Sequence, residues 1–219
     1  MEDCAGLLAL AARTTGRTEF TYRDRAMDPF AAPERLTVAE AFERFAGIDL
    51  LAGVAADGAT DRDRLAQGAQ GAGMRVAEDD SWADVFSRVM VEKVEPRLGL
   101  GRATILCEYP VAEAALARAS PRDPRVAERF ELYACGVELA NAFAELTDPA
   151  EQRRRFETEM AEMQRVYGQR YPIDEDFLAA LAEMPPACGA ALGFDRLVML
   201  ACGAQRIDQV IWTPVVEAG

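Results

Sequence analysis

The stretch RFELYACGVELANAF, residues 129–143, decides the fold class that the sequence indicates. Its two halves alternate apolar and polar side chains with the period of two that is typical of half-buried β-strands. Between them stand Cys135 and Gly136, a glycine-containing connection of the kind that joins antiparallel strands. The sequence therefore predicts a β-hairpin, and with it a domain that contains antiparallel sheet.

The same hairpin places two glutamates on one face of the sheet. With a two-residue loop, we expect Tyr133 to lie opposite Glu138. Glu131 then lies opposite Ala140, as a diagonal neighbour of Glu138 at roughly 7 to 8 Å. Buried carboxylates are costly unless they are paired or ligated, so this face either meets water or binds a charged group. Two carboxylates at this spacing suit a divalent cation that also carries phosphate oxygens.

The second strand carries a further polar set. Strict alternation places Asn141, Phe143 and Glu145 on one face, but this is the face opposite Glu138. A common site requires a β-bulge or a strong local twist between Leu139 and Asn141, because either would bring the two sets of side chains to one face. We therefore predict one of these two irregularities at that point.

The composition excludes several kinds of site. The 219 residues contain no histidine and five scattered cysteines without C-x-x-C spacing, which excludes Ser-His-Asp and Cys-His catalysis and argues against a zinc site. The net charge of −13 disfavours a broad nucleic-acid-binding surface. The chain shows neither a twenty-residue apolar run nor the basic start of a secretory signal, and with the cysteine pattern this predicts a reduced, cytoplasmic protein without a membrane span.

Helix and strand patterns surround the hairpin. Strand patterns cover residues 18–24 and 103–110, and Glu108 and Tyr109 are interpreted as ordinary strand-end residues. Helix patterns cover residues 5–14, a segment capped by Thr37 and Glu40, about 81–96 after a Ser81 cap, and about 174–184. The glycine- and alanine-rich segment 53–80 predicts a solvent-facing helix flanked by loops.

Asp148, with Pro149 after it, predicts the start of a longer helix that runs to about residue 168. The apolar positions that we expect to face inward are Phe156, Met160, Met163 and Tyr167. The run Arg153–Arg155 is interpreted as a solvated face of this helix.

Near the end of the chain, small residues precede another helix that begins at Asp195-Arg196 and ends near Gly203. These small residues are Gly189, Ala190, Ala191 and Gly193. Small side chains before a helix N-terminus let an anion such as phosphate approach the backbone, and Arg196 would add a positive charge. Tight strand-to-helix packing, with Arg196 in a salt bridge, explains the pattern equally well.

Two segments resemble signature sequences of class II aminoacyl-tRNA synthetases. ALGFDRLVMLACGA (191–204), followed by VIWTPV (210–215), is similar to the third signature motif of that class. RFELYACGVELANAFAELTDPAEQRRRF (129–156) resembles the lysine-binding strand pair of the lysyl branch. The resemblance covers most of residues 35–219. It is closer to the short members that attach lysine, preferentially β-lysine, to elongation factor P.

This resemblance implies ATP and Mg²⁺ as cofactors, and a ligase reaction in which an amino acid is activated as its adenylate and passed to an acceptor amine. Arg196 would be the catalytic residue that holds the γ-phosphate, next to Gly193 in the ATP site. Glu131 and Glu138 would bind Mg²⁺ and the nucleotide phosphates.

The resemblance also implies a lysine site further along the second strand. Asn141 and Glu145 would hold the polar groups of the substrate, with the carboxylate neutralising its ammonium group. Phe143 would pack on the methylene chain. Ala140 stands where lysyl-tRNA synthetases usually carry glycine, which indicates an altered amino-acid pocket.

By the same resemblance, residues 1–219 form a single partial catalytic domain of the α+β class, an antiparallel sheet flanked by helices. Neither an anticodon-binding domain nor the first two signature motifs are found in the sequence, so we expect a sheet that is incomplete on its N-terminal side. A homodimer fits the family, although the usual interface motif is missing from the sequence.

Three functions follow from the resemblance. The first is a ligase that acts on lysine or β-lysine with elongation factor P as acceptor. The second is a truncated, non-catalytic paralogue that binds nucleotide, amino acid or a partner subunit. A tRNA synthetase ranks last, because the charge is unfavourable and no anticodon-binding domain is visible.

Overall fold

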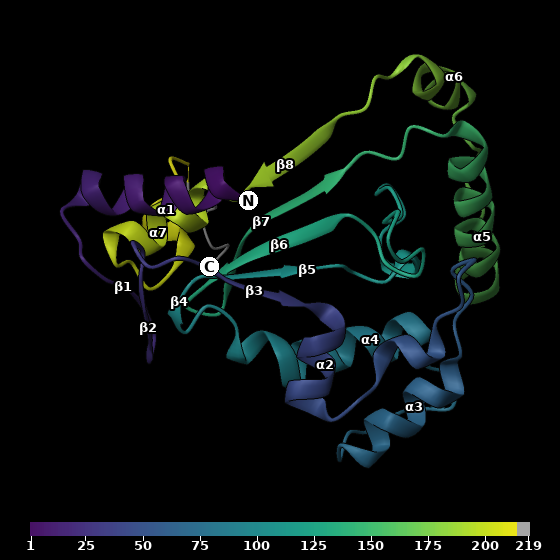
Figure 1. Ribbon diagram of the computed structural model, residues 1–219, viewed down its shortest axis with the longest axis horizontal. Helices are drawn as coiled ribbons and strands as arrows, with labels where there is room; N and C mark the ends of the chain where they lie inside the picture. Colours follow the sequence, from purple (N-terminus) through teal and green to yellow (C-terminus); the bar gives the residue numbers. More distant parts are fainter. Residues whose placement is uncertain (214–219) are drawn as a thin grey trace, which may run out of the picture.

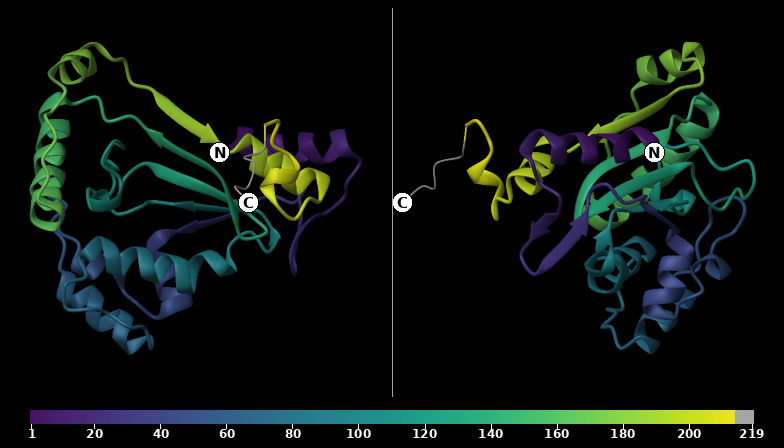
Figure 2. Two further views of the ribbon diagram at one scale, coloured as in Figure 1. Left: turned by 180° about the vertical axis from the view of Figure 1, so that it is seen from behind. Right: turned by 60° about the vertical axis from the view of Figure 1, so that its left-hand side comes forward.

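The computed structural model describes residues 1–213, which form two sheets flanked by helices (Figures 1 and 2). The larger sheet has the strand order β3-β5-β6-β7-β8 and is antiparallel except for the β3/β5 pair, while the smaller has the order β1-β2-β4. The strands are β1 Phe20–Tyr22, β2 Arg25–Asp28, β3 Glu34–Thr37, β4 Gly101–Arg102, β5 Thr104–Cys107, β6 Arg129–Ala134, β7 Val137–Ala144 and β8 Cys188–Leu192. The predicted α+β class is confirmed.

The predicted helices are present, with caps that the sequence indicated. Thr37 and Ser81 each form a reciprocal capping box with the third helical residue. The α-helices are α1 Glu2–Thr15, α2 Val38–Ala46, α3 Arg62–Gly71, α4 Trp82–Val89, α5 Pro149–Tyr167, α6 Glu175–Glu183 and α7 Phe194–Cys202. Helix α4 continues as the π-helix Met90–Val94, and the short 3₁₀-helices are Leu50–Gly53, Glu95–Arg97, Val111–Glu113 and Ile207–Gln209. The third-motif segment continues past residue 213, so Pro214 and Val215 lie outside the described residues.

The β6–β7 hairpin has the predicted two-residue loop. Cys135 and Gly136 have φ angles of 52° and 71°, the pair of positive values that a tight hairpin turn requires. As predicted, Tyr133 lies opposite Glu138.

The predicted bulge is also present, one residue earlier than expected. The register shifts between Leu132 and Tyr133, so Leu139 is the extra residue of β7. Glu131 consequently lies opposite Asn141, and the predicted pairing of Glu131 with Ala140 is wrong. The bulge places Glu138 and Asn141 on the same face of the sheet, as a common site requires.

Two apolar cores cover the two faces of the larger sheet. On one face, Leu106 and Tyr133 pack with α2, α3 and α4. On the other face, Ile105 and Leu132 pack with α1 and α7, which lie side by side in both views of Figure 2. A third cluster of small side chains, made of Val111, Ala114, Ala117 and Ala127, packs against Phe143 at the far end of the sheet.

Two helices depart from the expected burial. The segment 53–80 was predicted to be solvent-facing, but Leu65, Ala66 and Ala69 of α3 are buried, and Leu65 and Ala69 join the core with α2 and α4. In α5, Tyr167 is exposed rather than inward, and the buried side chains are Gln152 and Arg155. Arg155 therefore does not belong to a solvated face, because tertiary contacts decide its position.

All five cysteines are free. None of the helices in the described part of the chain combines the length and hydrophobicity that a membrane span requires.

Candidate functional site

Glu131 of β6 is the centre of the polar face between β6 and β7. It is only 7% exposed, and its carboxylate accepts three hydrogen bonds. Arg129 Nη2 donates to Oε1 at 2.5 Å, and the hydroxyl groups of Tyr109 and Tyr133 donate to Oε2 at 2.6 and 2.7 Å. The buried charge is thus compensated by one guanidinium group and two hydroxyl donors, while Oε1 retains a lone pair for a further ligand.

The two tyrosines remain protonated donors in this arrangement. Burial, followed by the negative charge of Glu131, raises the pKa of Tyr109 well above its usual value. The same two causes raise the pKa of Tyr133. Because both hydroxyl groups keep their protons at neutral pH, they fix the side-chain position of Glu131.

Arg129 connects Glu131 to two other parts of the site. Its Nε donates to Asn141 Oδ1 at 3.3 Å, and its Nη1 donates to the carbonyl oxygen of Glu113. The guanidinium also stacks on Tyr109, with 4.2 Å between its central carbon and the ring centroid. The Asn141 oxygen accepts from Arg129, and no hydrogen bond from the Asn141 amide N–H groups to another described residue is seen, so these donors can bind a ligand.

Glu138 and Arg196 form the more exposed side of the face. Arg196 Nη1 donates to the Glu138 carbonyl oxygen at 2.9 Å and lies 3.6 Å from Glu138 Oε2. Burial and then the charge of Glu131 raise the pKa of Glu138, while Arg196 opposes this effect. The salt-bridge interpretation of Arg196 thus describes the observed arrangement, and its side chain remains half-exposed.

Gly193 lies directly before α7. Its N–H donates to the carbonyl oxygen of Leu139, the bulge residue of β7, at 2.8 Å. A Cβ atom at Gly193 would come within 3.3 Å of Arg196 Cδ. Gly193 therefore joins β7 to the start of α7 and gives room to the arginine side chain.

The predicted lysine-site residues lie further along β7. Asn141 shares the face of its partner Glu131, and Phe143 lies opposite Arg129 and packs against the small side chains of the third cluster. Glu145 follows the end of the strand, and its Oε1 lies 2.7 Å from the place that a Cβ atom on Gly189 would occupy. The absence of a side chain at Gly189 thus makes room for the Glu145 carboxylate.

Ala140 is not brought together with the other predicted residues. It pairs with Leu132, and both are buried in the core under α1 and α7. Because of the bulge at Leu139, the Ala140 side chain points away from Glu131. Any influence of Ala140 on the amino-acid pocket is therefore indirect.

Sequence reasoning missed four residues of this face. Arg129, Tyr109 and Tyr133 bind the Glu131 carboxylate, and Gly189 gives room to Glu145. Tyr133 and Arg129 could have been found from the alternation, since they occupy the same strand face as Glu131. Tyr109 reaches the site from the end of β5, and no local pattern indicates that contact.

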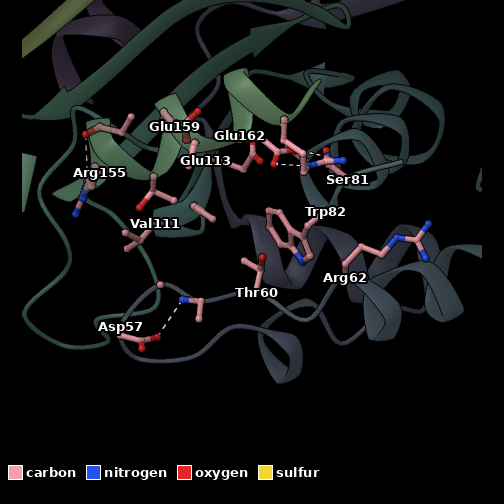
Figure 3. Close-up of a pocket in the computed structure, with 18 of the residues that line it drawn as sticks. Asp57, Thr60, Arg62, Ser81, Trp82, Val111, Glu113, Arg155, Glu159 and Glu162 are labelled. Carbon is pink, nitrogen blue, oxygen red and sulfur yellow. Dashed lines mark hydrogen bonds and ion pairs between the residues drawn. The ribbon is translucent and has the colours of Figure 1, made fainter. Parts of the chain in front are cut away.

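A cleft of about 930 Å³ lies between α5, the start of α4 and residues 57–60 (Figure 3). None of the predicted site residues lines it. Glu113 reaches it from the segment after β5, and burial raises the pKa of this carboxyl group to about 7, although Arg129 opposes the shift. Within residues 1–213, no group of three or more Cys, Asp or Glu side chains is placed to hold a metal ion.

Comparison with known proteins gives one family. A sequence profile described as class II tRNA synthetases (D, K and N) matches residues 10–217. The elongation factor P–(R)-β-lysine ligase of Proteus mirabilis (strain HI4320) is 43% identical over 190 residues, which are 85% of this chain and 56% of that protein.

Two further relatives carry the same description. The protein of Sodalis glossinidius is 43% identical over 186 residues, which are 84% of this chain and 56% of the relative. The protein of Haemophilus influenzae (strain PittGG) is 40% identical over 179 residues, which are 81% and 53% of the two chains. The chain thus spans about half the length of the curated relatives it matches.

Proposed function

The chain belongs to the class II tRNA synthetase family of the D, K and N type, and we propose that it serves the ATP-dependent activation of lysine or (R)-β-lysine for attachment to elongation factor P. The names of the relatives support (R)-β-lysine as the amino acid and elongation factor P as the acceptor. On this proposal, residues 1–219 belong to a single catalytic domain that works in the cytoplasm.

The observation that carries the proposal is the bulge at Leu139. It gathers Glu131, Glu138 and Asn141 on one face of the β6–β7 hairpin. This face suits ligands that bring positive charge, because the burial of the Glu138 carboxylate is only partly offset by Arg196, and the compensated Glu131 carboxylate retains a lone pair. Mg²⁺ and the ammonium groups of lysine are ligands of this kind.

The amino-acid end of the face lies near Phe143 and Glu145. Glu145 would pair with an ammonium group of the substrate, and Phe143 would cover its methylene chain. The free N–H donors of Asn141 would bind an acceptor group such as the substrate carboxylate. This division of roles separates the charged end of the substrate from its apolar stem.

The nucleotide end of the face lies near Glu138 and Arg196. Glu131 retains one lone pair on Oε1, and the pKa of Glu138 is raised in part by Glu131, so a cation between them would relieve their repulsion. Mg²⁺ bound by this pair would neutralise phosphate charge. The half-exposed Arg196 would pair with a phosphate group of ATP, in agreement with the preference of guanidinium for phosphate.

The experiment that tests the proposal is amino-acid-dependent exchange between ATP and pyrophosphate, with lysine and (R)-β-lysine as separate substrates. Exchange that depends on either amino acid and is lost in Arg196→Ala supports the proposed function. Arg206→Ala serves as the matched control, since Arg206 is an exposed arginine that forms an ion pair with Asp208.

Binding titrations with ATP and with each amino acid complete the test. Binding of both ligands without exchange would indicate the non-catalytic paralogue instead of the ligase. Protein that is folded by circular dichroism but binds neither ligand would contradict both.

A further inference from the structure

Helix α5 contains two polar side chains that are buried. Gln152 is 1% exposed and Arg155 is 7% exposed, although both belong to a helix that otherwise presents mainly polar side chains to solvent. Burial of a guanidinium group is costly unless its donors are satisfied. Their partners therefore indicate what the two side chains hold in place.

Those partners are backbone carbonyl groups of residues 114–118, which we call the wall segment. Arg155 Nη1 donates to the carbonyl oxygens of Ala114 at 2.9 Å, Ala115 at 3.4 Å and Ala117 at 2.8 Å. Gln152 Nε2 donates to the Ala115 carbonyl oxygen at 3.1 Å. Glu151 pairs with Arg155 Nε at 2.8 Å and orients the guanidinium toward the segment.

The wall segment in turn borders the amino-acid end of the site. Ala117 forms a backbone bridge with Glu145. On either side of this bridge, the Leu146 N–H donates to the Leu116 carbonyl oxygen at 2.9 Å, and the Arg118 N–H donates to the Ala144 carbonyl oxygen at 2.8 Å. The segment thus pairs with the residues at the end of β7 through an isolated antiparallel bridge.

The side chains of the wall segment also contribute to the site. Ala114 and Ala117 are buried in the cluster on which Phe143 packs. Arg155 and Ala115 of the wall segment both line the cleft of Figure 3.

We propose that Arg155, assisted by Gln152, is a positioning residue for the amino-acid end of the site. It does not touch the ligand. It sets the position of the wall segment relative to Phe143 and Glu145, and so controls the affinity for lysine or β-lysine without affecting the nucleotide end. The inference rests on the proposed function, which assigns the amino acid to this end.

The test compares ligand affinities of the full chain by calorimetric titration, with lysine and ATP in separate experiments. Arg155→Lys keeps the charge but loses the planar fork that reaches several carbonyl groups. Gln152→Glu keeps the shape but replaces the N–H donor with an acceptor that faces the Ala115 carbonyl oxygen. Arg154→Ala is the matched control, because Arg154 pairs with the same Glu151 and donates to the Asp57 carbonyl oxygen instead of to the wall segment.

Each of the two test variants is expected to weaken lysine binding about tenfold, equivalent to about 1.4 kcal/mol, and to leave the dissociation constant for ATP within about twofold. Hydrogen exchange supplies a readout that needs no ligand. The amides of Arg118 and Leu146 are expected to exchange faster in Arg155→Lys than in Arg154→Ala, while amides in the core strand β6 keep their rates.

The outcomes are distinguishable. Unchanged lysine affinity in both variants, in a chain that binds lysine before substitution, overturns the positioning role and leaves the proposed function standing. Equal losses for lysine and ATP also overturn it, because they indicate general destabilisation. If the unsubstituted chain binds no lysine, the proposed function fails and the inference about affinity fails with it, whatever the exchange rates of the wall segment.

Discussion

The substitution Glu113→Gln should make the stability of the protein less dependent on pH. In the fold, burial raises the pKa of the Glu113 carboxyl group from its ordinary value of 4.5 to about 7. Arg129 lowers it, and Glu159 and Asp84 raise it further. The folded protein therefore binds a proton at Glu113 more tightly than the unfolded chain does.

The sign of the effect follows from this difference in proton affinity. Below pH 4.5 the carboxyl group is protonated in both states, and its burial carries no charge penalty. Between pH 4.5 and about 7 the unfolded chain loses the proton first, so the free energy of unfolding falls as the pH rises. Above about pH 7 the group is ionised in both states, and the full penalty, about 3 kcal/mol, is present.

The assay is urea denaturation at pH 5, 6, 7 and 8, followed by circular dichroism. The difference in unfolding free energy, variant minus parent, should increase by roughly 2 to 3 kcal/mol between pH 5 and pH 8, because glutamine does not titrate. Glu157→Gln, a change at an exposed glutamate on α5 that does not contribute to the shift of the Glu113 pKa, is the control and should alter this difference little. A difference for Glu113→Gln that is the same at pH 5 and pH 8 would refute the reasoning.

Four further predictions concern the site and its support. Glu145→Gln should weaken lysine binding while ATP binding is retained, and equal losses in the two titrations would contradict its role. Gly189→Ala should weaken lysine binding as well, because the new Cβ would lie 2.7 Å from the Glu145 carboxylate and displace it; unchanged lysine affinity would show that the carboxylate moves without consequence. Tyr109→Phe removes one donor from Glu131 and should reduce the free energy of unfolding by about 1 to 3 kcal/mol in urea denaturation, whereas unchanged stability would mean that a solvent molecule replaces the hydroxyl. Gly99→Ala should lower the melting temperature measurably, because Gly99 has φ +68° and its Cβ would lie 2.7 Å from the backbone of β6; an unchanged melting temperature would contradict this.

Local features of the fold could be predicted from the sequence because they depend on neighbouring residues. The capping boxes at Thr37 and Ser81, and the turn at Cys135-Gly136, involve residues within four positions of each other. The irregularity in β7 could be predicted for a different reason. Strict alternation places Glu138 and Asn141 on opposite faces of the sheet, although both are expected in one site. The predicted position was wrong by one residue, because an extra residue at any of several positions between Glu138 and Asn141 brings these two side chains to the same face.

Contacts between distant segments could not be predicted. The hydroxyl of Tyr109 reaches Glu131 across 22 positions of the chain, and Arg155 reaches Ala114 across 41. Arg155 stands in a run of three arginines, and only the tertiary structure distinguishes the buried one from its exposed neighbours. The expected pairing of Ala140 with Glu131 is wrong for a related reason, since the register after the bulge differs by one residue from simple alternation.

The extra residue in β7 has a consequence for how the strand tolerates shortening. Removal of Leu139 would restore simple alternation, with Glu138 and Asn141 still on the same side, because it removes the residue that has no partner in β6. Removal of one residue between Asn141 and Ala144 would instead reverse the faces of the residues on one side of the deletion, so that site side chains point into the apolar core. A scan of single-residue deletions along β7 should therefore find its most tolerant position at Leu139, a buried leucine that substitution experiments would mark as essential.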